Sequence, residues 1–175
     1  NNSSLELQFP TWRPGRYEMG NFAKNVRNFQ IVDQNGKKVP FEKLNKASWS
    51  VDTEGITEIT VLYTYFSNEL NAGSTFMDDT QLYVNPVNCL VYIKEREFEA
   101  CSIRVNVPEN FELVCGSPHK ENRIAFVDVH DMMDSPFIAS ANLQHKTYSV
   151  FGITFHLWFH GIVELDWNRI LSDFE

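Results

Sequence analysis

The sequence predicts a mainly β protein, with antiparallel strands arranged as a sandwich or barrel and a short helix or two. Apolar and polar residues alternate along several short runs, as they do on strands that bury one face. Turn residues separate these runs at intervals of about ten residues, which is typical of sandwiches and barrels. Aromatic residues make up 14% of the 175 residues, and Phe and Tyr are enriched in strands.

The individual strands can be placed from this alternation. The run 57–66 carries apolar residues on both faces, so we expect a central strand that is covered on two sides. Asn35-Gly36 is a strong hairpin signal, and Phe151-Gly152 offers a tight link between two strands. Half-buried antiparallel strands are expected at 101–107, 123–129, 146–151 and 153–160.

Two segments break the period of two. Asn21–Phe29 has apolar residues at helical spacing behind a capping Asn, and both a short helix and an irregular loop fit it. In the segment 166–175, Asp166 is a candidate cap, and apolar residues follow at i, i+3, i+4 and i+7. We therefore expect one β-domain over 1–165 and, over 166–175, the start of a helix that leads toward a further domain.

Charge and composition exclude several classes of function. The net charge is −8, and no basic stripe is present to attract nucleic acid. No apolar run approaches the roughly 18 residues that a membrane-spanning helix needs. The three cysteines form no C-x-x-C motif, so they predict either three free thiols or one disulfide and a free thiol. Both cytoplasm and periplasm fit this composition.

The histidines invite a metal hypothesis that the pattern does not favour. His156 and His160 have the outer spacing of a zincin H-E-x-x-H helix, but Leu157 stands where the Glu belongs. The segment alternates like a strand, and on a strand the two rings would lie about 13 Å apart. We therefore expect a ladder on one face, which could also dock a neighbouring domain, formed by Thr154, His156, Trp158 and His160.

Other polar clusters and the tryptophans have two readings each. The stretch from His130 to Ser135 contains a His/Asp/Ser trio, but it lacks a G-x-S-x-G elbow and also fits a turn closed by Pro136. Asp78-Asp79 fits either a metal or amine site or a solvated turn. The four Trp residues could stack on sugars, although core and interface positions are commoner.

One stretch resembles a known family. Residues 12–17, WRPGRY, and residues 22–25, FAKN, resemble the W-x-P-G-x-Y and F-A-(K/R)-N signature of the glycyl aminopeptidase family, family 61 of the metallopeptidases. Further landmarks follow in the family's order over nearly the whole chain: the turn at 33–36, K-x-x-W at 46–49, the strand at 61–65, LYVN at 82–85 and DMMDSP at 131–136.

The resemblance implies a function for the chain. In this family the region is a non-catalytic, β-sandwich-like N-terminal domain that precedes a thermolysin-like catalytic domain with H-E-x-x-H, which is absent from these 175 residues. Zinc is therefore expected in the catalytic domain and no cofactor in this chain, which should be inactive alone. The implied partners are that catalytic domain and a peptide substrate, and the implied source is bacterial.

Candidate site residues follow from the resemblance and from the acidic loops. We expect the loop 78–85 or the turn at 131–134 to line the substrate cleft, with Asp79, Gln81, Asn85 and Asp134 as substrate-binding candidates. Trp12, Gly15, Arg16 and Tyr17 form an interdomain or structural motif, in which Pro14-Gly15 fits a type II turn. The alternatives are a carbohydrate-binding or a protein-binding β-sandwich module of the cell envelope.

Overall fold

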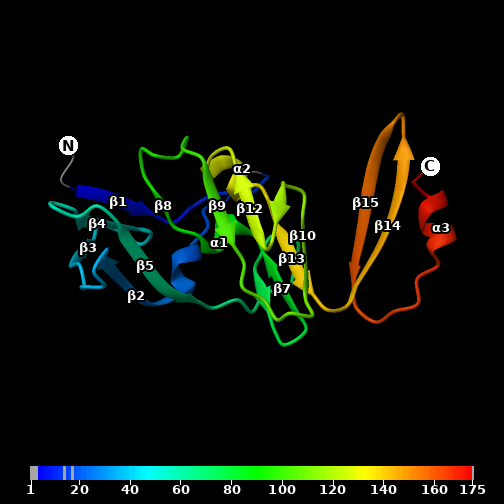
Figure 1. Ribbon diagram of the computed structural model, residues 1–175, viewed down its shortest axis with the longest axis horizontal. Coiled ribbons are helices and arrows are strands. Elements are labelled where there is room, and N and C mark those ends of the chain that lie inside the picture. Colours follow the sequence, from blue (N-terminus) through cyan, green and yellow to red (C-terminus); the bar gives the residue numbers. More distant parts are fainter. Residues whose placement is uncertain (1–3, 14, 17, 175) are drawn as a thin grey trace.

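A computed structural model describes residues 4–13, 15–16 and 18–174. In this part of the chain the strands form five antiparallel sheets, joined by loops, three short α-helices and one 3-10 helix. The predicted mainly β, antiparallel fold class is confirmed. The molecule is elongated, with β1 at one end and α3 at the other (Figure 1).

Two sheets enclose a first cluster of buried side chains, here called the N-terminal core. The four-stranded sheet has the order β3 (Phe41–Lys43), β4 (Ser48–Asp52), β1 (Ser4–Gln8), β8 (Tyr92–Ile93). The second sheet pairs β2 (Val26–Asp33) with β5 (Ile59–Tyr65). The aromatic rings between the sheets interlock, since Phe29 stacks on Trp49 at 4.4 Å and Phe9 meets Trp49 edge-on. The buried members are Leu7, Phe9, Ala23, Ile31, Val39, Ala47, Trp49 and Val51.

Two further sheets and two helices enclose a second cluster, here called the central core. One sheet has the order β10 (Glu112–Cys115), β13 (Phe137–Ser140), β7 (Gln81–Val84), β6 (Phe76–Met77), and the other has the order β11 (His119–Lys120), β12 (Arg123–Phe126), β9 (Cys101–Arg104). The helices are α1 (Pro86–Cys89) and α2 (Val129–Met133). The buried members are Val84, Cys89, Val105, Leu113, Ile124, Phe126, Met132, Phe137 and Ala139.

Strand β5 links the two cores. Tyr65 packs against both clusters, and the Tyr63 hydroxyl donates a hydrogen bond of 2.7 Å to the Cys89 carbonyl on α1. The expectation that both faces of β5 are covered is wrong, because the strand alternates between half-buried and exposed residues and Leu62 is 48% exposed. Among the described residues β5 pairs with β2 alone, and the N-terminal core covers one face of that pair.

The C-terminal part is a hairpin and a helix. β14 (Leu143–Val150) pairs along its length with β15 (Ile153–His160), and Phe151 and Gly152 both take positive φ in the link, as a tight hairpin turn requires. The expected link and the strand at 153–160 are thus confirmed, and the strand expected at 146–151 extends over 143–150. α3 (Trp167–Ser172) also forms as expected, and the Asp166 carboxylate caps it by accepting from the Arg169 N–H. The boundary at residue 165 remains a prediction.

Two local expectations are only partly met. The segment after Asn21 forms a single 3-10 helix, η1 (Phe22–Asn25), without a side-chain cap from Asn21. At Asn35-Gly36 the chain does turn, with Gly36 at a φ of 77°. The returning segment makes one bridge, Val32 to Lys38, and then β3 pairs with β4 instead of with β2. The local signal therefore predicts the turn but not the partner of the next strand.

The cysteines and the helices bear on two further expectations. All three cysteines are free, as the first of the two alternatives predicts, and burial raises the pKa of the Cys89 thiol to about 12. Cys101 and Cys115 are half-buried, and burial raises their pKa values too. No helix in the described part of the chain has the length and apolar character needed to span a membrane.

Replacing Tyr63 by Phe tests the link between the cores. The change removes the hydroxyl and leaves the Cys89 carbonyl without that donor, which should lower the free energy of unfolding by about 1–3 kcal/mol. Urea denaturation followed by tryptophan fluorescence measures it. Tyr148→Phe is the control, because no described residue hydrogen-bonds the Tyr148 hydroxyl; an equal loss in both variants would contradict the assigned role.

Candidate functional site

The loop 11–20, which carries the WRPGRY motif, closes on itself through backbone contacts. The Gly20 N–H donates to the Thr11 carbonyl at 2.7 Å, and the Arg16 N–H to the Arg13 carbonyl at 3.4 Å. Gly15 has a φ of 79°, as the third residue of a type II turn requires. The described residues thus have the expected turn, while Pro14 and Tyr17 lie outside them. Arg16 forms an ion pair with Glu18.

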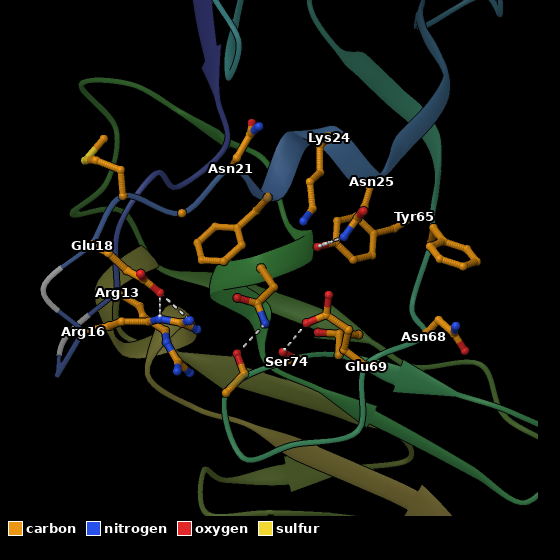
Figure 2. Close-up of a pocket in the computed structure, with 17 residues that line it drawn as sticks. Arg13, Arg16, Glu18, Asn21, Lys24, Asn25, Tyr65, Asn68, Glu69 and Ser74 are labelled. Atoms are coloured by element: carbon orange, nitrogen blue, oxygen red, sulfur yellow. Dashed lines mark hydrogen bonds and ion pairs between the residues drawn. The ribbon is translucent and has the colours of Figure 1, made fainter.

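This loop forms one side of a cavity of about 640 Å³ (Figure 2). The opposite sides come from η1, the segment after β5 and the loop before β6, and Asn88 of α1 contributes from the central core. Because η1 lies against α1, the cavity is situated where the two cores meet. The motif WRPGRY begins at residue 12 and the motif FAKN at residue 22. Residues of both motifs therefore line one site.

Cationic and anionic groups are unevenly distributed in the cavity. Its lining carries Arg13, Arg16 and Lys24 against Glu18 and Glu69, in a chain whose net charge is −8. Figure 2 shows Lys24 extending from η1 toward the cavity, with Arg13 and Arg16 on one side and Glu69 on the other. Arg16 and Glu18 neutralise each other in an ion pair, and the Glu69 carboxylate accepts a hydrogen bond from the Ser74 hydroxyl.

The buried part of the cavity is built from side-chain amides and hydroxyls. Asn88 is 3% exposed, and its Nδ2 donates to the Gly73 carbonyl at 2.8 Å. Its Oδ1 is buried and accepts no hydrogen bond from any described residue. Tyr65 contacts Asn25 through its hydroxyl at 3.3 Å, and burial raises the pKa of Tyr65 above its usual range.

The four substrate-binding candidates do not gather at one point. Asp79 is exposed in the turn between β6 and β7, and Gln81 is buried at the start of β7. Asn85 follows the other end of β7, and Asp134 precedes β13, whose first residue pairs with Val84. One strand of four residues spans about 10 Å, so Asp79 and Asp134 lie at opposite ends of the β7–β13 pair.

The hydrogen bonds of Asn85, and of Asp78 next to Asp79, show what these side chains do in the fold. Asp78 accepts three bonds from Thr80 and Gln81, and the backbone N–H of Thr80 lowers the pKa of Asp78. These bonds hold the Asp78 carboxylate in the turn, and Asp79 is exposed beside it. Asn85 is 8% exposed, and its Nδ2 donates to the Ser74 carbonyl at 2.6 Å, so it holds the loop that borders the cavity.

The stretch 130–136 is not arranged as a catalytic trio. It forms α2, capped by the Asp128 carboxylate, which accepts from the Asp131 N–H. The Ser135 hydroxyl donates to the Asp131 carbonyl, and its oxygen also lies 2.9 Å from the Ser117 hydroxyl. These groups are occupied with helix ends and loop contacts, as in the turn that was the simpler reading of the sequence.

The expected histidine ladder is present on β15. Thr154, His156, Trp158 and His160 share one face of the hairpin. From β14, His145 stacks on the Trp158 ring at 4.0 Å and lies 3.0 Å from a nitrogen of His156. The opposite face bears Tyr148 and Phe155, which stack toward Phe174 beyond the end of α3. On the ladder face Thr154 and His156 are exposed, whereas Trp158 and His160 are half-buried.

The tryptophans divide between core and surface. Trp49 is 4% exposed, whereas Trp12 is 50% exposed, so Trp49 takes a core position and Trp12 does not. Within residues 4–13, 15–16 and 18–174, no three His, Cys, Asp or Glu side chains come together as metal ligands would. The described residues therefore do not fit a zinc site.

Sequence reasoning missed the residues that give the cavity its buried end. Asn88, Gly73 and Thr75 belong to no motif singled out in the sequence. Thr75 accepts from the Asn85 N–H at 3.2 Å, and a methyl group on Gly73 would collide with the Arg13 guanidinium. One signal in the sequence could have indicated them: Asn85 and Asn88 stand on either side of Pro86 within an apolar run. A polar side chain that is buried in such a run requires a hydrogen-bond partner.

With this geometry in place, comparison with known proteins identifies the family. A family model described as the Peptidase M61 N-terminal domain matches residues 1–141. The matched part includes both cores and the cavity, and the chain belongs to this family. β14, β15 and α3 lie beyond the matched residues.

A solved structure supports the same fold. An aminopeptidase N family protein from Idiomarina loihiensis is similar to the chain, with a TM-score of 0.90 and 22% sequence identity. The alignment covers 99% of this chain and 30% of that protein, so the chain spans less than a third of its length. A search of curated proteins found no match.

Substitutions at two of the candidates should separate structural from surface positions. Asn85→Ala removes the donor to the Ser74 carbonyl and should lower the free energy of unfolding by about 1–3 kcal/mol. Asp79→Asn, at an exposed turn position, should leave stability unchanged within error. Thermal and urea unfolding measure both; a stable Asn85→Ala variant would show that the amide is free for another role.

Proposed function

We propose that the chain is the non-catalytic N-terminal β-domain of a zinc-dependent aminopeptidase resembling glycyl aminopeptidase. In this role it helps to form the substrate cleft and docks a thermolysin-like catalytic domain. The family match over residues 1–141 carries the proposal. In this proposal zinc is held by the catalytic domain, as the resemblance to the glycyl aminopeptidase family implies.

The hairpin β14–β15 supports the docking part of the proposal. It lies beyond the family match, its main tertiary contacts are between its own two strands, and α3 covers one of its faces. A two-stranded sheet is marginally stable in water without a further layer. The other face, with His145, His156 and Trp158, is thus the surface on which we expect the catalytic domain to pack.

The acidic ends of the β7–β13 pair support the cleft part. An aminopeptidase must bind a free α-ammonium group, and carboxylates are suitable acceptors for it. Asp79 and Asp134 are both exposed, so either is accessible to a peptide. They lie at opposite ends of the pair, so each is tested separately.

The first test compares the chain with the full-length gene product. Incubated with zinc and an aminoacyl p-nitroanilide, the 175-residue chain should release no nitroaniline, because it has no metal-ligand cluster among its described residues. The full-length protein should hydrolyse the substrate and lose activity when a chelator removes zinc. Hydrolysis by the chain alone, or an inactive full-length protein that binds no zinc, would contradict the proposal.

A second test locates the cleft. In the full-length enzyme, Asp79→Asn and Asp134→Asn are each compared with Glu54→Gln, an exposed carboxylate near the far end of the N-terminal core. Losing a charge-assisted contact should raise KM about tenfold or more for a peptide with a free amine, and less for its N-blocked counterpart. An unchanged ratio in both Asp variants would exclude these residues from amine binding.

A further inference from the structure

The strongest unexplained feature outside the acidic loops is the buried oxygen of Asn88 in the cavity between the two cores. The side chain is 3% exposed, and its orientation is fixed because Nδ2 donates to the Gly73 carbonyl. Oδ1 therefore remains as an acceptor, without a donor from any described residue. Buried polar atoms nearly always have a partner, so this oxygen is a candidate acceptor for the N–H or O–H of a bound molecule.

A cationic group lies next to this acceptor. The Arg13 guanidinium packs against Gly73 so closely that a methyl group there would collide with it, and the Gly73 carbonyl is the partner of the Asn88 amide. Arg13 and Asn88 are thus placed around one residue. Arg16 is already paired with Glu18, whereas neither Arg13 nor Lys24 has a carboxylate partner among the described residues.

The rest of the lining limits the kind of ligand. Phe22, Tyr65 and Phe66 supply apolar surface, and the cavity of about 640 Å³ exceeds what a simple ion needs. A fitting molecule carries an anionic group for a guanidinium or ammonium, a hydrogen-bond donor close to that group, and an apolar body. Arginine favours planar carboxylates because they match the two N–H groups of its guanidinium.

We propose that this cavity binds an α-carboxylate together with the N–H of the same residue, as presented by the C-terminal residue of a peptide. The carboxylate contacts Arg13 and Lys24, the N–H donates to Asn88 Oδ1, and the apolar side chain lies against Phe22 and Tyr65. A free amino acid shares the same chemistry and is the second source to be distinguished.

Four small probes test the two polar contacts separately on the 175-residue chain. N-acetyl-L-leucine carries both groups, N-acetyl-L-leucinamide lacks the carboxylate, and 4-methylpentanoate lacks the N–H. L-leucine represents the free amino acid. NMR titration of ¹⁵N-labelled chain should give a dissociation constant on the order of 1 mM for N-acetyl-L-leucine and at least tenfold weaker binding for the amide and for 4-methylpentanoate.

The outcomes decide between the possibilities. If only N-acetyl-L-leucine binds, the natural ligand is the C-terminal residue of a peptide. If L-leucine binds equally well, a free amino acid is also a ligand. Both outcomes support the proposal. Equal binding of 4-methylpentanoate, equal binding of the amide, or no shift at 20-fold the expected constant (about 20 mM) would each overturn it.

Two variants connect the binding to named residues. Arg13→Gln removes the cation, and Gly73→Ala retains it but displaces the guanidinium, because the new methyl group occupies its place. Each should raise the dissociation constant for N-acetyl-L-leucine about tenfold or more. Arg104→Gln, on β9 and outside the cavity, is the charge-matched control and should bind like the unaltered chain.

The variants also allow for a loss of folding. Asn88→Ala removes the acceptor, but it also removes the bond to the Gly73 carbonyl, so its spectrum must first match that of the unaltered chain. If it does not, the probes and the Arg13 and Gly73 variants still decide the question. Unchanged binding in both Arg13→Gln and Gly73→Ala would overturn the proposal.

Discussion

The contact of β5 with α1 holds the two halves of the structure together. Tyr63 extends from a strand of the N-terminal core and donates to the Cys89 carbonyl in the central core, and Tyr65 packs against both clusters. Burial of the two phenols raises their pKa values, so both hydroxyls remain neutral at ordinary pH; Tyr63 donates to the Cys89 carbonyl, and Tyr65 accepts from the Asn25 amide. Each core is closed by its own sheets, and β5 fixes one relative to the other.

The cavity is a consequence of the same junction. Here η1 lies against α1, and the loop 11–20 closes the cavity beside this contact. The lining residues are held from both sides: Tyr65 by Asn25, and Asn88 by the Gly73 carbonyl. A group bound there would contact both cores, so binding and the relative position of the cores are physically linked.

The sequence predicts local structure well here and long-range arrangement less well. Alternation predicts strands at 146–151 and 153–160, where the structure has 143–150 and 153–160, and Asp166 correctly predicts the cap of α3, because these signals depend on neighbours in the chain. The burial of β5 is mispredicted, since apolar Leu62 is exposed once one sheet face has no covering layer. The buried end of the cavity was also missed, because Asn88 meets Gly73 only after both loops fold.

The hairpin beyond the family match is best understood from its two faces. On one face the rings of Tyr148, Phe155 and Phe174 stack in series, so α3 and the hairpin stabilise each other. On the other, His145 covers part of Trp158, and the shared hydrogen bond with His156 requires that one of the two rings be a donor and the other an acceptor.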